Sequence, residues 1–328
     1  MNFHRPVLRR FIGLFGLAAT TALQPLPAAA QQWPAKPIRM IVPYSAGGGA
    51  DNAARILAQR LGTALQTPVL VENRPGASGI IGAQAVAKAE PDGYTVLYDA
   101  STFAVNPSLR KMPFDPATDL IPVSLVLTVP NILVVSPKGP AASFKAFVAR
   151  ARAEPHKISF ASYGAGSPAH LAGELLNREA GIGMLHVPYK GGAPALADVI
   201  GGQVDAYFAN AGSALGYVQS GKLKALAVTS SRRMAALPEV PTVAESGFPN
   251  FEVLEWNGVF VPKGTAQSTI DRLSSEIQAA VRDPETRARL VKSGADPVGG
   301  TPTEFATFIG GQTSRWAQLI KANKITAE

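Results

Sequence analysis

The sequence contains no cysteine and only four histidines among its 328 residues. Without cysteine the chain has no disulfide, no thiol nucleophile and no thiolate metal site. No pair of histidines has the spacing of metal ligands, and one of the four, His4, lies close to the N-terminus. We therefore expect neither a metal site nor a bound cofactor.

Charged residues are also scarce, at 16% of the chain, whereas apolar residues make up 46%. This balance predicts a well-packed globular protein rather than a disordered one. Leaving out the three arginines of the first thirty residues, 28 basic residues face 23 acidic ones. Because these charges are scattered and not grouped in blocks, nucleic acid is not indicated as a partner, and a small anionic molecule fits better.

The first thirty residues have the pattern of a secretory signal. Arg5, Arg9 and Arg10 precede an apolar stretch at 11–23, and small residues follow at 28–30. The stretch is shorter than the ~20 residues that a membrane-spanning helix needs, so a signal peptide over 1–30 is predicted. Export without disulfides fits the bacterial periplasm. The paired arginines leave the twin-arginine route open, although the Sec route is favoured.

From Ile38 onward, short apolar strands alternate with amphipathic helices. Strands are expected at 38–43, 69–72 and 94–98, and a second series of the same kind runs from 143 to 229. Two apolar segments, 123–129 and 132–136, are interrupted by Pro130, as expected where a chain passes between domains. The alternation predicts two related α/β domains with parallel strands, and ligands bind beyond the carboxyl ends of such strands.

A glycine-rich loop joins the first strand to the first helix and is predicted to bind an anion. Glycine lets a ligand approach the backbone, and the first amides of a helix have no partner within the helix. The loop carries no lysine, which excludes a nucleotide P-loop. The candidate ligand contacts are Tyr44, Ser45, Ala46, Gly47, Gly48 and Asp51. Asp51 has an alternative role as a cap of the helix.

A second loop has the same strand, glycine and helix pattern. Its candidate contacts for a distal carboxylate are Ser162, Gly164, Gly166 and Ser167, with Pro168 near the first helical position. His170, one turn further, is interpreted as a packed structural histidine. A bulky residue at Gly48 or Gly166 is expected to abolish binding while the protein still folds.

Further candidates follow other strands. Ser101 and Thr102 have hydroxyls for a ligand or for capping a short helix, and Asn210 is a candidate polar contact across a hinge. Tyr189 and Lys190 end a strand before another glycine pair, and Lys190 either balances ligand charge or faces solvent.

An enzyme is the competing class, because Ser162 or Ser167 with His170 and Asp51 would supply the groups of a hydrolase triad. However, the sequence contains no Gly-x-Ser-x-Gly elbow, and Ser167 and His170 share one helix start, a poor arrangement for a nucleophile and its base. No Gly-x-Gly-x-x-Gly precedes a helix with dinucleotide-binding spacing. We expect no catalytic residues.

Six separated motifs closely resemble the Bug family, the periplasmic solute-binding proteins of tripartite tricarboxylate transporters. They are WPAKPIR (33–39), GGGAD (47–51), ENRPGA (72–77), PDGYT (91–95), VPYKGG (187–192) and GKLKALAVT (221–229). The resemblance implies a type II periplasmic-binding-protein fold, with two Rossmann-like lobes joined by two crossover segments around a ligand cleft. It further implies that a small organic acid is held largely by main-chain amides and delivered to a membrane permease.

On this basis, lobe 1 is expected to comprise 31–131 plus 252–328, and lobe 2 to comprise 132–251. The protein is expected to be a monomer. Tyr44 departs from the family's usual phenylalanine before the glycines, which favours an aromatic or extended acid. A sensor subunit that signals carboxylate to a histidine kinase would close in the same way, so the sequence leaves that alternative open.

Overall fold

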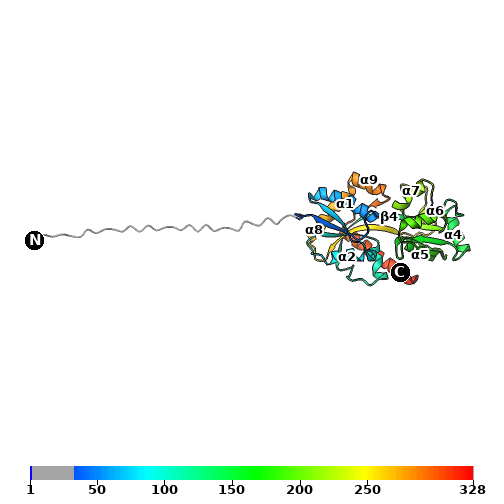
Figure 1. The fold of residues 1–328 in the computed structure, drawn as a ribbon, viewed down its shortest axis with the longest axis horizontal. Helices are drawn as coiled ribbons and strands as arrows, with labels where there is room; N and C mark the ends of the chain where they lie inside the picture. Colours follow the sequence, from blue (N-terminus) through cyan, green and yellow to red (C-terminus); the bar gives the residue numbers. More distant parts are fainter. Residues whose placement is uncertain (2–32, 328) are drawn as a thin grey trace. The chain divides into compact units, whose positions relative to one another are not determined.

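The fold is built on a mixed sheet whose strand order is β2-β1-β3-β9-β4-β7-β5-β6, with β8 and β10 also pairing with β4 (Figure 1). The structure is a computed structural model, and it describes residue 1 and residues 33–327. The predicted signal peptide and its export route lie outside the described residues. Within them, no helix has both the length and the apolar character needed to cross a membrane.

The first half of the sheet has the predicted α/β alternation. β1 pairs in parallel with β2 and β3, and the helices between them supply the crossovers. The helix α1 buries Ala53, Leu57 and Leu61, which recur every four residues along one face. The elements are β1 (Ile38–Val42), α1 (Gly49–Leu65), β2 (Val69–Asn73), η1 (Ala77–Gly79), α2 (Ile80–Ala87), β3 (Thr95–Ala100) and α3 (Thr102–Leu109).

The second half repeats this pattern, with β5 parallel to both β6 and β7. In Figure 1 its green and yellow-green elements gather at the opposite end of the fold from α1, α2 and α8. The elements are α4 (Phe144–Ala153), β5 (Ser159–Ser162), α5 (Pro168–Ala180), β6 (Leu185–Pro188), α6 (Gly192–Gly201), β7 (Ala206–Asn210), α7 (Ala211–Gln219) and β8 (Lys224–Val228).

One long strand, β4 (Leu120–Val135), belongs to both halves. Its residues 120–130 pair with β9 (Leu254–Pro262), and its residues 131–135 pair with β7. The expected interruption at Pro130 is therefore wrong. Pro130 pairs with Leu254, the first residue of β9, so its missing N–H falls at the end of that ladder, where one lost hydrogen bond costs little.

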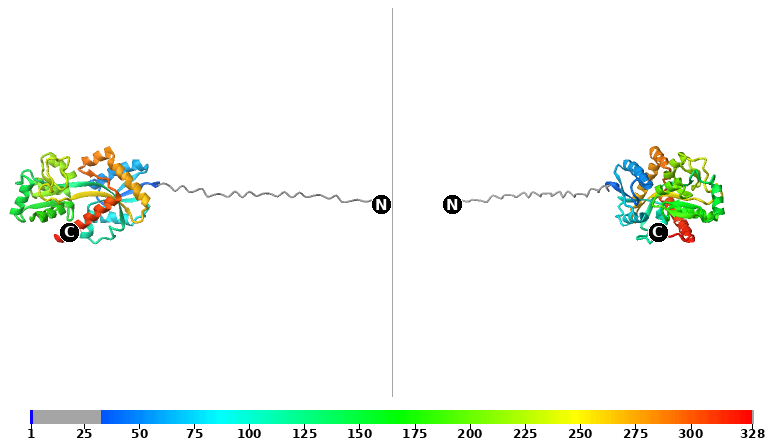
Figure 2. Two further views of the ribbon diagram at one scale, coloured as in Figure 1. Left: turned by 180° about the vertical axis from the view of Figure 1, so that it is seen from behind. Right: turned by 45° about the vertical axis from the view of Figure 1, so that its right-hand side comes forward.

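The last segment adds α8 (Gln267–Arg282), α9 (Pro284–Lys292), the short strand β10 (Asp296–Pro297) and α10 (Pro302–Ala322). Phe305 of α10 packs with Trp256 and Phe260 in one hydrophobic cluster. Trp316, Leu319 and Ile320 of the same helix belong to the cluster of the second half, and Figure 2 shows the red helix extending toward it. The helix α10 thus contacts both lobes, although the sequence pattern predicts that 252–328 belongs to lobe 1.

Candidate ligand-binding site

A cavity of about 550 Å³ is lined by residues from both halves of the sheet. Its wall contains glycines, tyrosines, small polar residues and one carboxylate, Glu255. The side chains that line it among the described residues include no lysine, arginine or histidine. The lining residues are Tyr44, Gly47, Gly48, Gly49, Ala50, Asn52, Ala53, Ala100, Ser101, Thr102, Leu127, Val129, Tyr163, Pro168, Gly192, Tyr207, Asn210, Gly212, Ser213, Glu255, Asn257, Ser293 and Ala295.

The N-terminus of α1 forms one part of this wall. Gly48 is the N-cap residue, and no side chain caps the helix. The amides of Gly49 and Ala50 lie in the first turn, where a helix offers them no acceptor. These amides and the helix dipole favour a negatively charged group. The predicted contacts Gly47 and Gly48 both line the cavity.

The other predicted residues of this loop have different environments. The Asp51 carboxylate is buried and accepts hydrogen bonds from the Gly47 amide at 2.8 Å, Arg55 Nε at 3.0 Å and Asn73 Nδ2 at 2.9 Å. Burial raises the pKa of Asp51, but these hydrogen bonds outweigh it and leave the pKa below its ordinary value. Asp51 therefore stabilises the glycine loop through its hydrogen bond with the Gly47 amide. Ser45 and Ala46 are exposed and do not line the cavity.

Tyr44, Ser101 and Thr102 all line the cavity, as candidate contacts should. The Tyr44 hydroxyl donates to Asp99 Oδ1 at 2.6 Å and lies 2.7 Å from Thr102 Oγ1. Burial raises the pKa of Asp99 to about 7, although the Tyr44 hydrogen bond opposes this. Burial and the nearby Asp99 raise the pKa of Tyr44, which keeps the phenol neutral. Ser101 is the N-cap residue of α3 but makes no capping hydrogen bond with its side chain.

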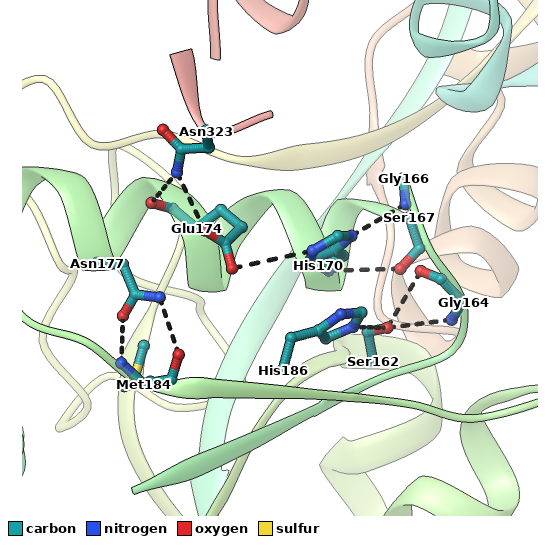
Figure 3. Close-up of polar contacts among 10 residues, drawn as sticks. All are labelled: Ser162, Gly164, Gly166, Ser167, His170, Glu174, Asn177, Met184, His186 and Asn323. Carbon is teal, nitrogen blue, oxygen red and sulfur yellow. Dashed lines mark hydrogen bonds and ion pairs between the residues drawn. The ribbon is translucent and has the colours of Figure 1, made fainter. Parts of the chain in front are cut away.

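The second glycine loop uses its amides within the chain (Figure 3). The Gly164 amide donates to Ser162 Oγ at 3.1 Å, the Gly166 amide to His170 Nδ1 at 3.1 Å, and the Ser167 amide to the Gly164 carbonyl at 3.1 Å. Ser167 Oγ caps α5 by accepting the His170 amide at 3.3 Å. The four predicted contacts of this loop do not line the cavity, whereas its Tyr163 and Pro168 do.

A pair of stacked histidines lies next to this loop, of which His170 is buried and His186 is partly exposed. The rings of His170 and His186 stack with centroids 3.7 Å apart, and Ser162 Oγ lies 2.7 Å from His186 Nε2 (Figure 3). Burial lowers the pKa of His170 to about 3, with a contribution from His186, and the pKa of His186 to about 4. Both rings are therefore neutral at physiological pH. Ser162 Oγ contacts His186, Ser167 Oγ accepts the main-chain amide of His170, and Asp51 pairs with Arg55. The groups of the hydrolase triad are therefore not assembled.

Beyond these loops, Tyr189 and Lys190 do not line the cavity. The Tyr189 hydroxyl donates to Asp198 Oδ2 at 2.7 Å, and Lys190 is exposed. The following residue pair is more informative, because Gly191 is an N-cap residue without a side-chain cap and Gly192 lines the cavity. The N-terminus of α6 thus resembles that of α1, whereas α5 is capped by its own serine.

Asn210 lines the cavity and also caps α7, because its Oδ1 accepts the Gly212 amide at 2.9 Å. It further helps to hold Glu255, a residue that sequence reasoning missed. The Tyr163 hydroxyl donates to Glu255 Oε1 at 2.7 Å. Burial raises the pKa of Glu255, and the hydrogen bonds from Tyr163 and Asn210 oppose that rise. Tyr163 lies inside the second glycine loop. Glu255 is the only charged residue of β9, and an acid in a largely buried strand is the signal that could have identified it.

The two lobes, the cavity between them and the uncapped helix N-termini in its wall define a solute-binding protein. The family profile described as "Tripartite tricarboxylate transporter family receptor" matches residues 53–325. The chain belongs to this family, which places it among periplasmic binding proteins and not among enzymes.

Individual relatives agree with this assignment. The protein BugT of Bordetella pertussis is 39% identical over 317 residues, covering 96% of this chain and 97% of BugT. The structure of the periplasmic binding protein BugD is 37% identical, with a TM-score of 0.77 over 90% of this chain and all of BugD. The structure of R. palustris Rpa4515 with adipate is 32% identical, with a TM-score of 0.80 over 90% of this chain and all of that one. The resemblance to the Bug family and the two-lobe fold predicted from it are confirmed.

Proposed function

We propose that this protein captures a small organic carboxylate in the cavity between its lobes and delivers it to the membrane permease of a tripartite tricarboxylate transporter. The observation that carries this proposal is the uncapped N-terminus of α1 in the cavity wall. Its free amides supply hydrogen bonds and about half a positive charge without any cationic side chain. The adipate bound in the R. palustris relative supports a carboxylate as the ligand class.

Six of the predicted contacts fit this role by their position in the wall: Tyr44, Gly47, Gly48, Ser101, Thr102 and Asn210. Gly192, at the uncapped start of α6, lines the cavity from the same lobe as Asn210. Closure of the two lobes over the acid would bring both helix N-termini to the ligand. Lobe boundaries at 131/132 and 251/252, a monomeric state and export by the Sec route belong to the same proposal.

A thermal-shift screen of organic acids, followed by calorimetry on protein purified after export, tests the binding step. At least one monocarboxylate, dicarboxylate or aromatic acid should raise the melting temperature and bind at a single site without being converted. A clean negative across these classes would refute carboxylate capture, and product formation would point to catalysis.

The delivery step needs a separate experiment in cells. Uptake of the identified acid should fall when either this gene or the permease genes are deleted. Unchanged uptake, together with a transcriptional response to the acid that is lost on deletion of this gene, would favour the sensor role instead.

A further inference from the structure

The part of the cavity wall around Glu255 differs in chemistry from the N-terminus of α1. Glu255 accepts hydrogen bonds from Tyr163, at 2.7 Å, and from Asn210. Burial raises the pKa of Glu255, whereas these two hydrogen bonds favour its ionised form. The lining side chains of the described residues include no lysine, arginine or histidine that would balance the charge of a second acid. This part of the wall therefore offers a hydrogen-bond acceptor and not a second anion site.

A hydroxyl group without a partner lies in the same wall. Tyr207 is fully buried and lines the cavity, and its Oη has no hydrogen-bond partner among the described residues. A Cβ placed on Gly192, another lining residue, would lie 3.2 Å from this oxygen. Glu255 is close enough for its charge to contribute to a raised pKa of Tyr207. A buried hydroxyl without a hydrogen-bond partner in the protein is expected to pair with a ligand.

Resting on the proposed function, we infer that the ligand has a single carboxylate and, away from it, a hydroxyl or ammonium group that donates to Glu255 and contacts Tyr207. The carboxylate lies at the N-terminus of α1, where amides are free. A second carboxylate near Glu255 would place two acid groups together without a cation, and it would have no proton to donate. Glu255 is thus the residue that selects hydroxy or amino monocarboxylates against dicarboxylates.

The test compares matched ligands of equal length by calorimetry at neutral pH. The probes are adipate, its ω-hydroxy monoacid analogue and its ω-amino monoacid analogue, with an aromatic pair of terephthalate and para-hydroxybenzoate. At least one monoacid should bind about tenfold to a hundredfold more tightly than the diacid of the same length, the discrimination expected when buried polar groups are left unpaired. Diacids that bind as tightly as the monoacids would overturn the inference while leaving carboxylate capture intact. If no acid binds, the proposed function fails as well.

Two variants test whether Glu255 and Tyr207 cause this selectivity. Glu255→Gln keeps an acceptor for Tyr163 and removes the acid group, so it should reduce the preference for the monoacid at least about tenfold. Tyr207→Phe should weaken monoacid binding by about the same factor, because it removes only the hydroxyl. Glu252→Gln is the matched control, since Glu252 lies three residues away outside the cavity wall and accepts from the Ser231 amide at 3.2 Å. An unchanged preference in Glu255→Gln, or an equal loss in Glu252→Gln, would overturn the role of Glu255.

Discussion

Replacing Gly48 and Gly166 by leucine should separate ligand binding from folding. Gly48 has φ −73° and ψ 169°, which any residue adopts, and a Cβ there would make an ordinary contact of 3.4 Å with the Ser45 carbonyl. We therefore expect Gly48→Leu to change the free energy of unfolding by no more than about 0.5 kcal/mol. Its side chain would occupy the cavity in front of the α1 amides, so binding should be lost.

Gly166 should behave in the opposite way. Its φ of +74° is left-handed, and a Cβ would overlap with Leu109 Cδ1. A left-handed conformation costs about 1–2 kcal/mol for a residue other than glycine, and overpacking costs about 1–3 kcal/mol more. Gly166→Leu should therefore lose about 2–5 kcal/mol of unfolding free energy. The sequence alone predicts that both variants fold and that both lose binding.

Urea denaturation followed by circular dichroism measures the unfolding free energy, and calorimetry with an acid found in the screen measures binding. Gly48→Leu should keep the midpoint of the wild type and lose at least about a hundredfold in affinity, whereas Gly166→Leu should shift the midpoint. Wild-type affinity in Gly48→Leu, or wild-type stability in Gly166→Leu, would refute this reasoning.

Three further predictions concern stability. Asp99→Asn removes a carboxyl group whose pKa is raised to about 7 by burial. The stability of the wild type relative to this variant should therefore fall as the pH rises from about 4 to 7. Denaturation curves of both proteins across that range test this, and a constant difference in stability would contradict it. The pKa of His170 is lowered to about 3, so the free energy of unfolding should fall by about 1.4 kcal/mol per pH unit as the pH falls below 6.5. In the His170→Asn variant, stability should fall less steeply at acid pH. The same pH dependence in both proteins would exclude the effect. Thr301→Ala breaks a capping box with Glu304 and should cost about 1 kcal/mol, with Thr303→Ala as the control; equal stability of the two variants would count against the cap.

Local pattern was enough to predict the alternation of strands and helices, whereas the two-lobe fold was predicted from the family resemblance. The apolar runs at Ile38–Val42 and Ala206–Asn210 are strands, and Gly48 and Asn210 are the N-cap residues of the helices that follow. The sequence predicts a strand break at Pro130, but the strand β4 continues through it. A proline is accommodated there because β9 begins opposite it, and this pairing joins residues more than 120 positions apart in sequence. The contact of α10 with both lobes was likewise not predictable. Apolar residues at its two ends pack into different hydrophobic clusters, one in each lobe.

The candidate site was predictable only in its first half. The three glycines at 47–49 leave the N-terminus of α1 without a capping side chain, and the structure places that terminus in the cavity wall. Ser167 before Pro168 is itself a capping pattern, so its hydroxyl and the neighbouring amides are used within the loop. Glu255 could not be placed by sequence, because its partners Tyr163 and Asn210 come from separate elements of the other lobe.

The central claim is that a carboxylate binds at the free amides of the α1 N-terminus and not at the internally bonded second loop. Nuclear magnetic resonance of glycine-labelled protein, titrated with the acid found in the screen, tests this claim residue by residue. The amides of Gly48 and Gly49 should shift in proportion to occupancy, and those of Gly164 and Gly166 should move far less. Large shifts at Gly164 and Gly166 with none at Gly48 and Gly49 would contradict the account.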